Sequence, residues 1–222
     1  MTKLTVPEVF IIETLDPDDE GNGRFEGSII SQTLRLQGKN CRYKYVRTQK
    51  EFEKAVRQFG SSSYRYLHLS CHADRKGMIT TNQDEISFDA LAVILRPHLA
   101  KRRLFLSACE MAQPQLAKKI MHQSGCFSMI GPNKEVNFCD AAVFWAALYH
   151  LLFSENFNEM KQAQISPLLE RTSSLFQLPI KYYTRSRTED SGYREVPLRS
   201  SNKPTKTDTS LGKLKRRALQ AP

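Results

Sequence analysis

Two short apolar segments, residues 64–74 and 104–109, constrain the fold more than any other part of the 222-residue chain. Each segment is largely apolar and then stops abruptly at small or polar residues. Such runs are typical of strands buried on both faces of a parallel sheet. In open α/β sheets, ligands and chemistry are found at the C-terminal ends of the strands. His72 and Cys109 stand at these two ends, so neighbouring strands would bring both side chains to one crevice.

A thiol and an imidazole in one crevice are the minimum set for a cysteine nucleophile with a general base. A cysteine with an ordinary pKa near 8.5 is mostly protonated at neutral pH, and a nearby imidazole can accept its proton. The same residues also have a plainer interpretation. A lone cysteine at a strand end is often a small buried hydrophobe, and a lone histidine there is often a hydrogen-bonded structural residue.

The order of predicted elements alternates between strand and helix, which indicates an α/β fold with a parallel, doubly wound sheet. One helix start is well marked, because Thr48 and Glu51 have the spacing of a capping box. We expect strands at residues 8–13, 41–46, 64–72, 104–109 and 126–131, and helices at 25–36, 48–60, 88–95, 116–125, 140–153 and 157–170. We also expect a small hairpin over residues 76–87 and a last extended segment at 178–183.

The cysteine content indicates a reducing compartment. The five cysteines are odd in number, widely spaced and free of any CxxC pair, which fits a reduced cytoplasmic protein. His68, Cys71 and His72 lie close together, but no second matched pair completes a zinc site, so we expect no metal. No apolar run is long enough to span a membrane, and the N-terminus lacks a signal-peptide pattern. We therefore expect no membrane association.

The composition changes near Thr184, and we expect two parts: a folded domain over residues 1–183 and a basic, disordered tail over 184–222. Residues 181–222 hold eleven Lys and Arg against four Asp and Glu, a surplus of seven in a chain whose net charge is +10. Such a segment cannot bury enough apolar surface to fold alone. It is a solvated tail or a docking segment for an acidic partner. Nucleic-acid contact is the weaker alternative, because no stacking aromatic residues are interleaved.

Three motifs, taken in order, resemble the caspase-like cysteine peptidases and in particular their bacterial CHAT-domain branch. The first is residues 67–72, Leu-His-Leu-Ser-Cys-His, followed by the predicted hairpin. The second is residues 106–109, Leu-Ser-Ala-Cys. The third is the strand ending at Gly131 and the aromatic helix that follows it. The resemblance covers about residues 5–183 and implies a caspase-like three-layer αβα sandwich with a mainly parallel central sheet.

The resemblance implies a mechanism and a set of site residues. Cys109 would attack the scissile carbonyl, His72 would carry the proton to the leaving amine, and the N–H groups of Ala73 and Cys109 would hold the oxyanion. Ala73 stands where the family usually has glycine. If this position requires a positive φ, an alanine is strained there and activity is reduced. Asp74, Glu110 and Asp140 are acidic residues that would select a basic substrate side chain or simply be solvated.

The implied function is that of a cysteine endopeptidase which cleaves a protein substrate in a bacterial defence or regulatory pathway. Because no sensor repeat is visible in the chain, we expect a latent enzyme that an activating protein partner switches on. The same motifs also allow a catalytically inactive scaffold that serves as an interaction or signalling module. A flavodoxin-like binding protein is disfavoured, because no Gly-rich phosphate loop follows the first strand, and we expect no cofactor.

Overall fold

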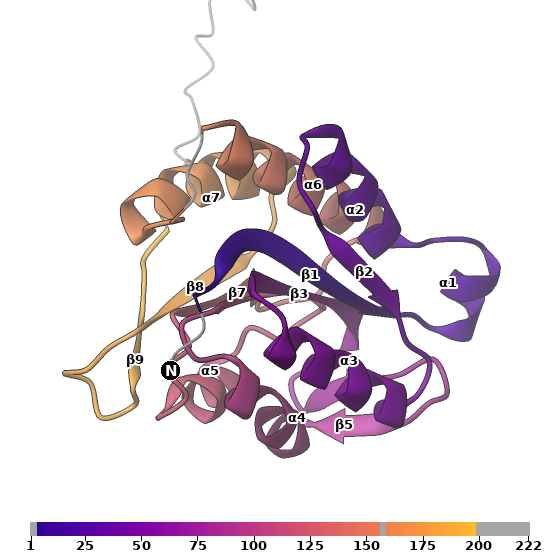
Figure 1. Cartoon of the computed structure of the whole chain (residues 1–222), viewed down its shortest axis with the longest axis horizontal. Helices are drawn as coiled ribbons and strands as arrows, with labels where there is room; N and C mark the ends of the chain where they lie inside the picture. The colour runs from indigo at the N-terminus through magenta and orange to yellow at the C-terminus, as the bar shows by residue number, and fades with distance from the viewer. Residues whose placement is uncertain (1–3, 156–158, 199–222) are drawn as a thin grey trace, which may run out of the picture.

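A β-sheet that is parallel over most of its width runs through the middle of the protein (Figure 1). The computed structural model describes residues 4–155 and 159–198. The strands are β1 (Val6–Thr14), β2 (Arg42–Tyr45), β3 (Tyr64–Ala73), β4 (Gly77–Ile79), β5 (Glu85–Ser87), β6 (Arg103–Ser107), β7 (Ser128–Pro132), β8 (Ile180–Arg185) and β9 (Tyr193–Glu195). Their order in the sheet is β2-β1-β3-β6-β7-β8-β9, and the hairpin of β4 and β5 is attached to β3. The neighbouring strands β2, β1, β3, β6 and β7 are parallel to one another, and β8 and β9 are antiparallel to their neighbours.

Helices cover both faces of this sheet and form the outer layers of a three-layer sandwich (Figure 1). The helices are α1 (Pro17–Gly21), α2 (Glu26–Leu36), α3 (Gln49–Ser61), α4 (Phe88–Leu95), the 3-10 helix η1 (Arg96–His98), α5 (Pro114–Met121), α6 (Phe138–Ser154) and α7 (Gln162–Phe176). The buried residues of α3, α4 and α5 pack on one face of the sheet, and those of α2, α6 and α7 pack on the other. The predicted αβα fold with a mainly parallel sheet is confirmed.

The predicted pairing of the two key strands is also confirmed, because β3 and β6 are adjacent and parallel. Their register pairs Tyr66 with Arg103 at one end and Ser70 with Ser107 at the other. Both strands are almost fully buried between the two helical layers. Their C-terminal ends therefore reach the same edge of the sheet at the same level.

The folded part of the chain extends beyond the boundary expected at residues 183–184, which falls inside β8. Two features explain the difference. The ring of Tyr193 lies 5.3 Å from that of Tyr183 in an edge-on contact, and Val196 is buried against the α6 side of the sheet. These few apolar side chains are enough to hold β9 on the sheet edge, although the surrounding composition is polar. The rest of the expected tail, residues 199–222, lies outside the described residues.

None of the helices described here combines the length and the apolar character that a membrane span requires. The most apolar long helix, α6, has 17 residues and packs against the sheet through its aromatic side chains.

A buried carboxyl group ties together the ends of β3 and β6. Glu26, the first residue of α2, is 1% exposed and accepts hydrogen bonds from Ser70 Oγ at 2.7 Å and Ser107 Oγ at 2.6 Å. Burial raises the pKa of Glu26 to about 7, although both serine hydroxyls act in the opposite direction, and the nearby Glu13 carboxylate raises it further. Glu26 thus joins one helix and two strands at the edge where His72 and Cys109 emerge.

The raised pKa of Glu26 predicts that this residue makes the protein less stable as the pH rises. Between the unfolded pKa of 4.5 and the folded value of about 7, the folded state keeps a proton that the unfolded state has released. The free energy of unfolding therefore falls across this window, by about 3 kcal/mol in all. Glu26→Gln keeps a neutral group at every pH, so its stability relative to the wild type should grow as the pH rises from about 4 to about 8.

Urea unfolding of both proteins at several pH values measures this difference. Glu85→Gln, at an exposed position of β5, is the matched control and should show no such trend. Parallel pH curves for the wild type and Glu26→Gln would contradict a raised pKa at Glu26.

Candidate functional site

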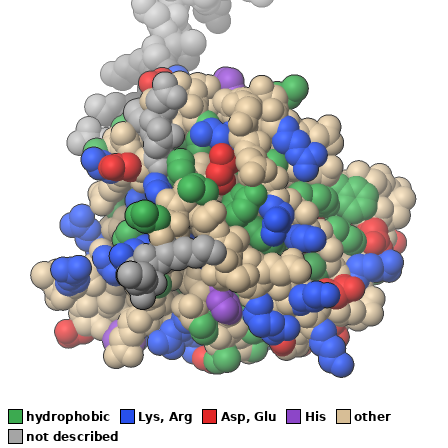
Figure 2. Space-filling model, viewed as in Figure 1, with side chains coloured by type: hydrophobic (Ala, Val, Ile, Leu, Met, Phe, Trp, Pro, Cys, Tyr) green, Lys and Arg blue, Asp and Glu red, His purple; other side chains and the backbone are tan. Residues whose placement is uncertain are grey.

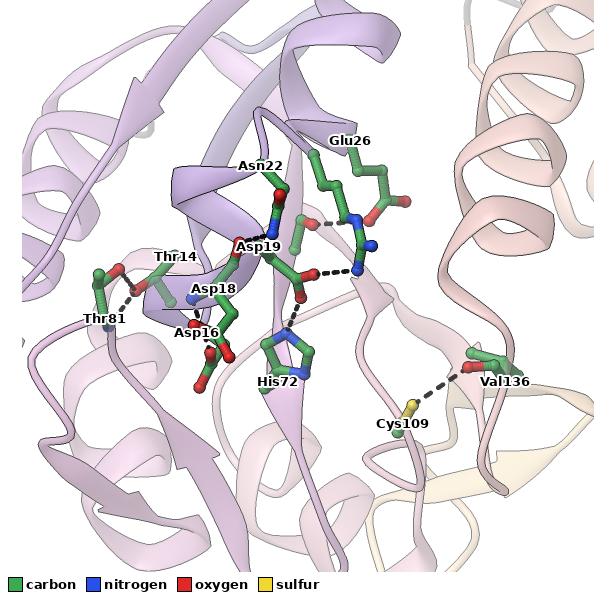
Figure 3. Close-up of polar contacts among 12 residues, drawn as sticks. Thr14, Asp16, Asp18, Asp19, Asn22, Glu26, His72, Thr81, Cys109 and Val136 are labelled. Atoms are coloured by element: carbon green, nitrogen blue, oxygen red, sulfur yellow. Dashed lines mark hydrogen bonds and ion pairs between the residues drawn. The ribbon is translucent and has the colours of Figure 1, made fainter.

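His72 and Cys109 both lie at the C-terminal edge of the sheet, as predicted (Figure 3). His72 is the second-last residue of β3, two positions after Ser70, and Cys109 lies two positions after Ser107. Since side chains alternate along a strand, His72 is directed to the same face as Ser70. Ser70 reaches Glu26, so this is the α2 face of the sheet. Cys109 lies in the turn that follows β6, and its thiol reaches the loop before α6 at Val136.

The imidazole of His72 is held by a carboxylate that sequence reasoning did not identify. His72 Nε2 lies 2.7 Å from Asp19 Oδ2, and Asp19 Oδ1 also accepts a hydrogen bond from Arg24 Nη1 at 2.8 Å. Partial burial works to raise the pKa of Asp19, but the contacts with His72 and Arg24 outweigh it and hold the pKa below its usual value. Asp19 is therefore an anion at neutral pH, and only a protonated Nε2 can donate to it.

In the neutral form of the ring, this contact determines the role of the other nitrogen. In a neutral imidazole, one nitrogen carries the proton and the other is an acceptor. With Nε2–H donating to Asp19, Nδ1 is the acceptor. Figure 3 shows Nδ1 on the side of the ring that is turned toward Cys109. His72 is thereby set up to receive a proton from that side.

The thiol of Cys109 is half-buried and makes its hydrogen bond to the backbone. Cys109 Sγ donates to the carbonyl oxygen of Val136, in the loop between β7 and α6, at 3.6 Å. Within the described part of the chain, no hydrogen bond joins Cys109 to His72. The two side chains occupy one edge of the sheet as separate groups, His72 held by helix α1 and Cys109 by the loop before α6.

The backbone at Ala73 is relaxed. Ala73 belongs to β3 and pairs with Met78 of β4, and it is not among the described residues that have a positive φ. The strain considered for an alanine at this position is therefore absent. A left-handed residue does occur nearby, since Glu110, directly after Cys109, has a φ of 55°.

The N–H group of Ala73 is directed away from β4. The next pair along the hairpin, Asp74 with Gly77, is hydrogen-bonded, since Asp74 N–H donates to Gly77 O at 3.0 Å. In an antiparallel ladder, hydrogen-bonded and non-hydrogen-bonded pairs alternate. The Ala73–Met78 pair is thus a non-hydrogen-bonded one. The N–H of Cys109 has no acceptor among the described residues. The N–H of Cys109 is therefore available to an oxyanion, and the N–H of Ala73 is not used by the ladder with β4.

The three acidic residues expected to bind substrate have different surroundings. Asp74 Oδ1 accepts from the N–H groups of Lys76 and Gly77, so it closes the turn between β3 and β4. Glu110 forms an ion pair with Arg75 at 2.9 Å, which links the loop after His72 to the residue after Cys109. Asp140 is exposed in the first turn of α6 and has no ion pair with any described residue. Of the three, only the carboxylate of Asp140 is uncommitted.

Three of the other four cysteines are buried, and the fourth is exposed. Cys71 and Cys126 are buried, and desolvation raises the pKa of both thiols, that of Cys126 to about 12. Cys41 is buried and donates to Ser31 O. Cys139 is exposed in the first turn of α6, so it is the one accessible competitor of Cys109 among the described thiols.

The residues that suggested a zinc site do not converge. His68 packs on the α6 side, where its Nδ1 lies 3.1 Å from Tyr149 Oη and burial lowers the pKa of the ring to about 3. Cys71 packs on the opposite face, with the core of α3 and α4. In the described ranges, no group of three His, Cys, Asp or Glu residues could hold a metal ion.

Sequence reasoning missed Asp19 and Glu26. Asp19 lies in the acidic stretch Asp16–Glu20, which was interpreted only as a turn. A signal was available, because this stretch follows β1, and β1 lies beside β3 with its C-terminal end at the same edge. Glu26 carried no such signal, since one Glu at the start of a helix is usually a favourable surface residue.

Comparisons of the sequence with protein-family models and with curated proteins find no match. Among solved structures, the chain is similar to a secreted C11 cysteine protease from Bacteroides thetaiotaomicron in complex with an irreversible peptide inhibitor, with a TM-score of 0.53 and 9% identity. That match covers 80% of this chain and 66% of the other. The Arg-specific cysteine proteinase gingipain R (RgpB) and a complex of the Porphyromonas gingivalis RgpB pro- and mature domains give TM-scores of 0.49, at 11% and 12% identity. These matches cover 80% of this chain and 47% and 48% of the others. The chain thus spans less than two thirds of each, and its likeness to the C11 protease shows a shared fold.

Proposed function

We propose that this protein is a cysteine endopeptidase of the caspase-like superfamily, in its CHAT-domain branch, with Cys109 as nucleophile and His72 as general base. The observation that carries the proposal is the contact between His72 Nε2 and Asp19. It leaves Nδ1 as a proton acceptor on the side of Cys109, at the sheet edge where the two strands end together. The fold shared with a C11 cysteine protease supports the same reaction class.

The proposed reaction begins with transfer of the thiol proton to His72 Nδ1. The sulfur then forms a bond to the scissile carbonyl carbon, and the carbonyl oxygen becomes an oxyanion that accepts from the N–H groups of Ala73 and Cys109. His72 returns its proton to the leaving amine as the peptide bond breaks. Water then gives a proton to the same nitrogen as its oxygen bonds to the thioester carbon. The C–S bond breaks, the acid product leaves, and the proton returns to the Cys109 sulfur. Asp19 stabilises the imidazolium throughout.

The proposed substrate carries a basic side chain before the scissile bond. Asp140 supports this choice, because it is exposed and unpaired, and α6 begins just after the loop whose Val136 carbonyl contacts Cys109. Asp74 and Glu110 are less suited, since turn amides and Arg75 already occupy their carboxylates.

We also propose that a protein partner activates the enzyme, in the cytoplasm and within a defence or regulatory pathway. Two features favour activation. The thiol proton is engaged with Val136 rather than with His72, and an exposed ion pair between Arg75 and Glu110 links the two loops of the site. Such a pair is weak enough for a bound partner to displace. Five free thiols favour a reducing compartment.

An inactive scaffold is the second candidate, and the same contact between Cys109 and Val136 favours it. In that case the site would be a remnant and the molecule would act through its surface. Activity measurements on Cys109 variants separate the two candidates.

The dyad predicts that Cys109→Ala and His72→Ala each lower kcat/KM for peptide cleavage about a thousandfold or more. Cleavage is measured with the full chain and with the proteins encoded beside its gene added as candidate activators. Cys139→Ala is the matched control, because it removes the other accessible thiol and should leave the rate unchanged. A peptide ketone that alkylates thiols should label Cys109 and spare Cys139. Absence of cleavage and of Cys109 labelling under every condition, with a Cys109→Ala protein that is still functional in cells, would establish the scaffold.

The contact with His72 predicts that Asp19→Asn lowers kcat/KM about tenfold to a hundredfold while leaving KM nearly unchanged. An amide can accept the same hydrogen bond but cannot stabilise the imidazolium with a charge. The expected loss is therefore in kcat, measured in steady-state cleavage assays. Asp18→Asn, one position earlier in α1, is the control. Equal activity of Asp19→Asn and the wild type would remove Asp19 from the mechanism.

The unpaired carboxylate of Asp140 predicts a preference for Arg or Lys before the scissile bond. Asp140→Asn should raise KM for such peptides about tenfold and change cleavage of uncharged peptides little. Asp74→Asn, which alters a turn residue, serves as the comparison. A wild-type enzyme that prefers acidic or apolar residues at this position would show that Asp140 does not select the substrate.

A further inference from the structure

A cavity lies at the opposite edge of the sheet, where β3 and β6 begin and β8 ends. It is a cavity of about 540 Å³, and its lining includes Arg65, Lys101, Arg103, Lys161, Arg185 and the single acid Glu159. Glu159 is already paired with Lys161 at 2.8 Å. The cavity therefore has a strong excess of positive charge, and Lys and Arg side chains are also prominent on the face of the molecule seen in Figure 2.

One of these cations is buried without a counter-ion. Arg103 is 9% exposed and forms no ion pair with any described residue. Its Nη1 donates to Ser128 Oγ at 2.8 Å, and its guanidinium lies 5.6 Å from the centre of the Phe127 ring. Buried charges in proteins are normally paired or bound to an ion. The environment of Arg103 thus lacks an anion.

Polar atoms without partners gather around the same cavity. Arg103 Nε, Tyr182 Oη and Thr184 Oγ1 are buried and form no hydrogen bond of normal geometry with a described group, although the Arg103 guanidinium lies near the Tyr182 hydroxyl, where it opposes the rise in pKa that burial causes. All three belong to lining residues, and all three can donate. Buried donors without acceptors are uncommon in native proteins, and three in one place suit a group rich in acceptor oxygens.

The aromatic ring of Phe127 brings two guanidinium groups together. Arg185 lies 5.5 Å from the ring centre and Arg103 lies 5.6 Å from it. Two like charges on one ring repel each other, and an anion between or beside them would relieve that repulsion. The N-terminus of the 15-residue helix α7 also borders the cavity through Gln162 and adds partial positive charge.

We propose that this cavity binds a small molecule that carries more than one phosphate group. Guanidinium groups match phosphate oxygens in a two-pronged geometry, and several cations in one cavity favour a polyanion over a single carboxylate. A nucleic acid fits less well, because the ring that could stack on a base is already covered by guanidinium groups. The site lies at the far edge of the sheet from Cys109, so it does not depend on the proposed peptidase activity.

The experiment is calorimetric titration of the full chain with inorganic pyrophosphate at constant ionic strength. Arg185→Gln and Lys101→Gln should each weaken binding about tenfold, as expected for the loss of one charge-assisted contact. Lys118→Gln, an exposed lysine on α5 outside the cavity, should leave the affinity unchanged. Citrate, which carries carboxylates in place of phosphates, should bind more weakly than pyrophosphate.

Three results would overturn the proposal. The first is no detectable binding of pyrophosphate by a folded wild-type chain. The second is an equal loss of affinity in Lys118→Gln and Arg185→Gln, which would indicate only general attraction to a basic surface. The third is tighter binding of a short single-stranded oligonucleotide than of pyrophosphate with the same sensitivity to Arg185→Gln, which would assign the cavity to nucleic acid. Thermal unfolding of each variant confirms that it is folded, and the two cavity variants lie in different segments.

Discussion

The parallel pairing of β3 with β6 is the constraint on which the rest of the structure depends. Its register sets Ser70 beside Ser107, and the buried carboxyl group of Glu26 binds both hydroxyls. A shift by one residue would turn every side chain of one strand to the opposite face. A shift of β3 would separate the serines, place an apolar side chain against Glu26 and turn His72 to the opposite face of the sheet. The meeting of the β3 and β6 ends at one level of the sheet edge is thus a consequence of the register between these two strands.

The same sheet gives the molecule two edges of different character. At the edge where β3 and β6 end, the Asp19 carboxylate contacts His72, and the carboxyl group of Glu26 joins the two strands that lead to His72 and Cys109. At the edge where these strands begin, arginines and lysines line a cavity whose lining residues also include Arg103, Tyr182 and Thr184, each with a buried polar atom that forms no hydrogen bond of normal geometry with a described group. The strands between the two edges are apolar and buried on both sides, so the charged groups of one edge do not neutralise those of the other. Each edge therefore keeps its own electrostatic character.

The parts of the structure that depend on local pattern could be predicted from the sequence. Apolar runs such as that of β6 and the capping box of Thr48 and Glu51 determine elements within their own segments, so the layers and the pairing of β3 with β6 followed from them. Two features depend on contacts between distant segments. Asp19 meets His72 across a sequence separation of 53 residues, and the β9 segment is held by Tyr193 and Val196 in a polar context. No periodicity within either segment reveals its partner.

The short helix α1, which contacts His72 through Asp19, affects the local stability of the candidate site. Helix α1 has five residues and buries none of them, although Asp19, within it, makes the contact that orients the imidazole. A short helix without buried side chains opens locally at a much lower free energy than the core strands. The orientation of His72 is therefore governed by the least protected part of this edge rather than by the rigid sheet beneath it. On heating, His72 would lose its contact with Asp19 while β3 and β6 remain paired. The orientation of the imidazole would therefore be lost at a lower temperature than that at which the sheet unfolds.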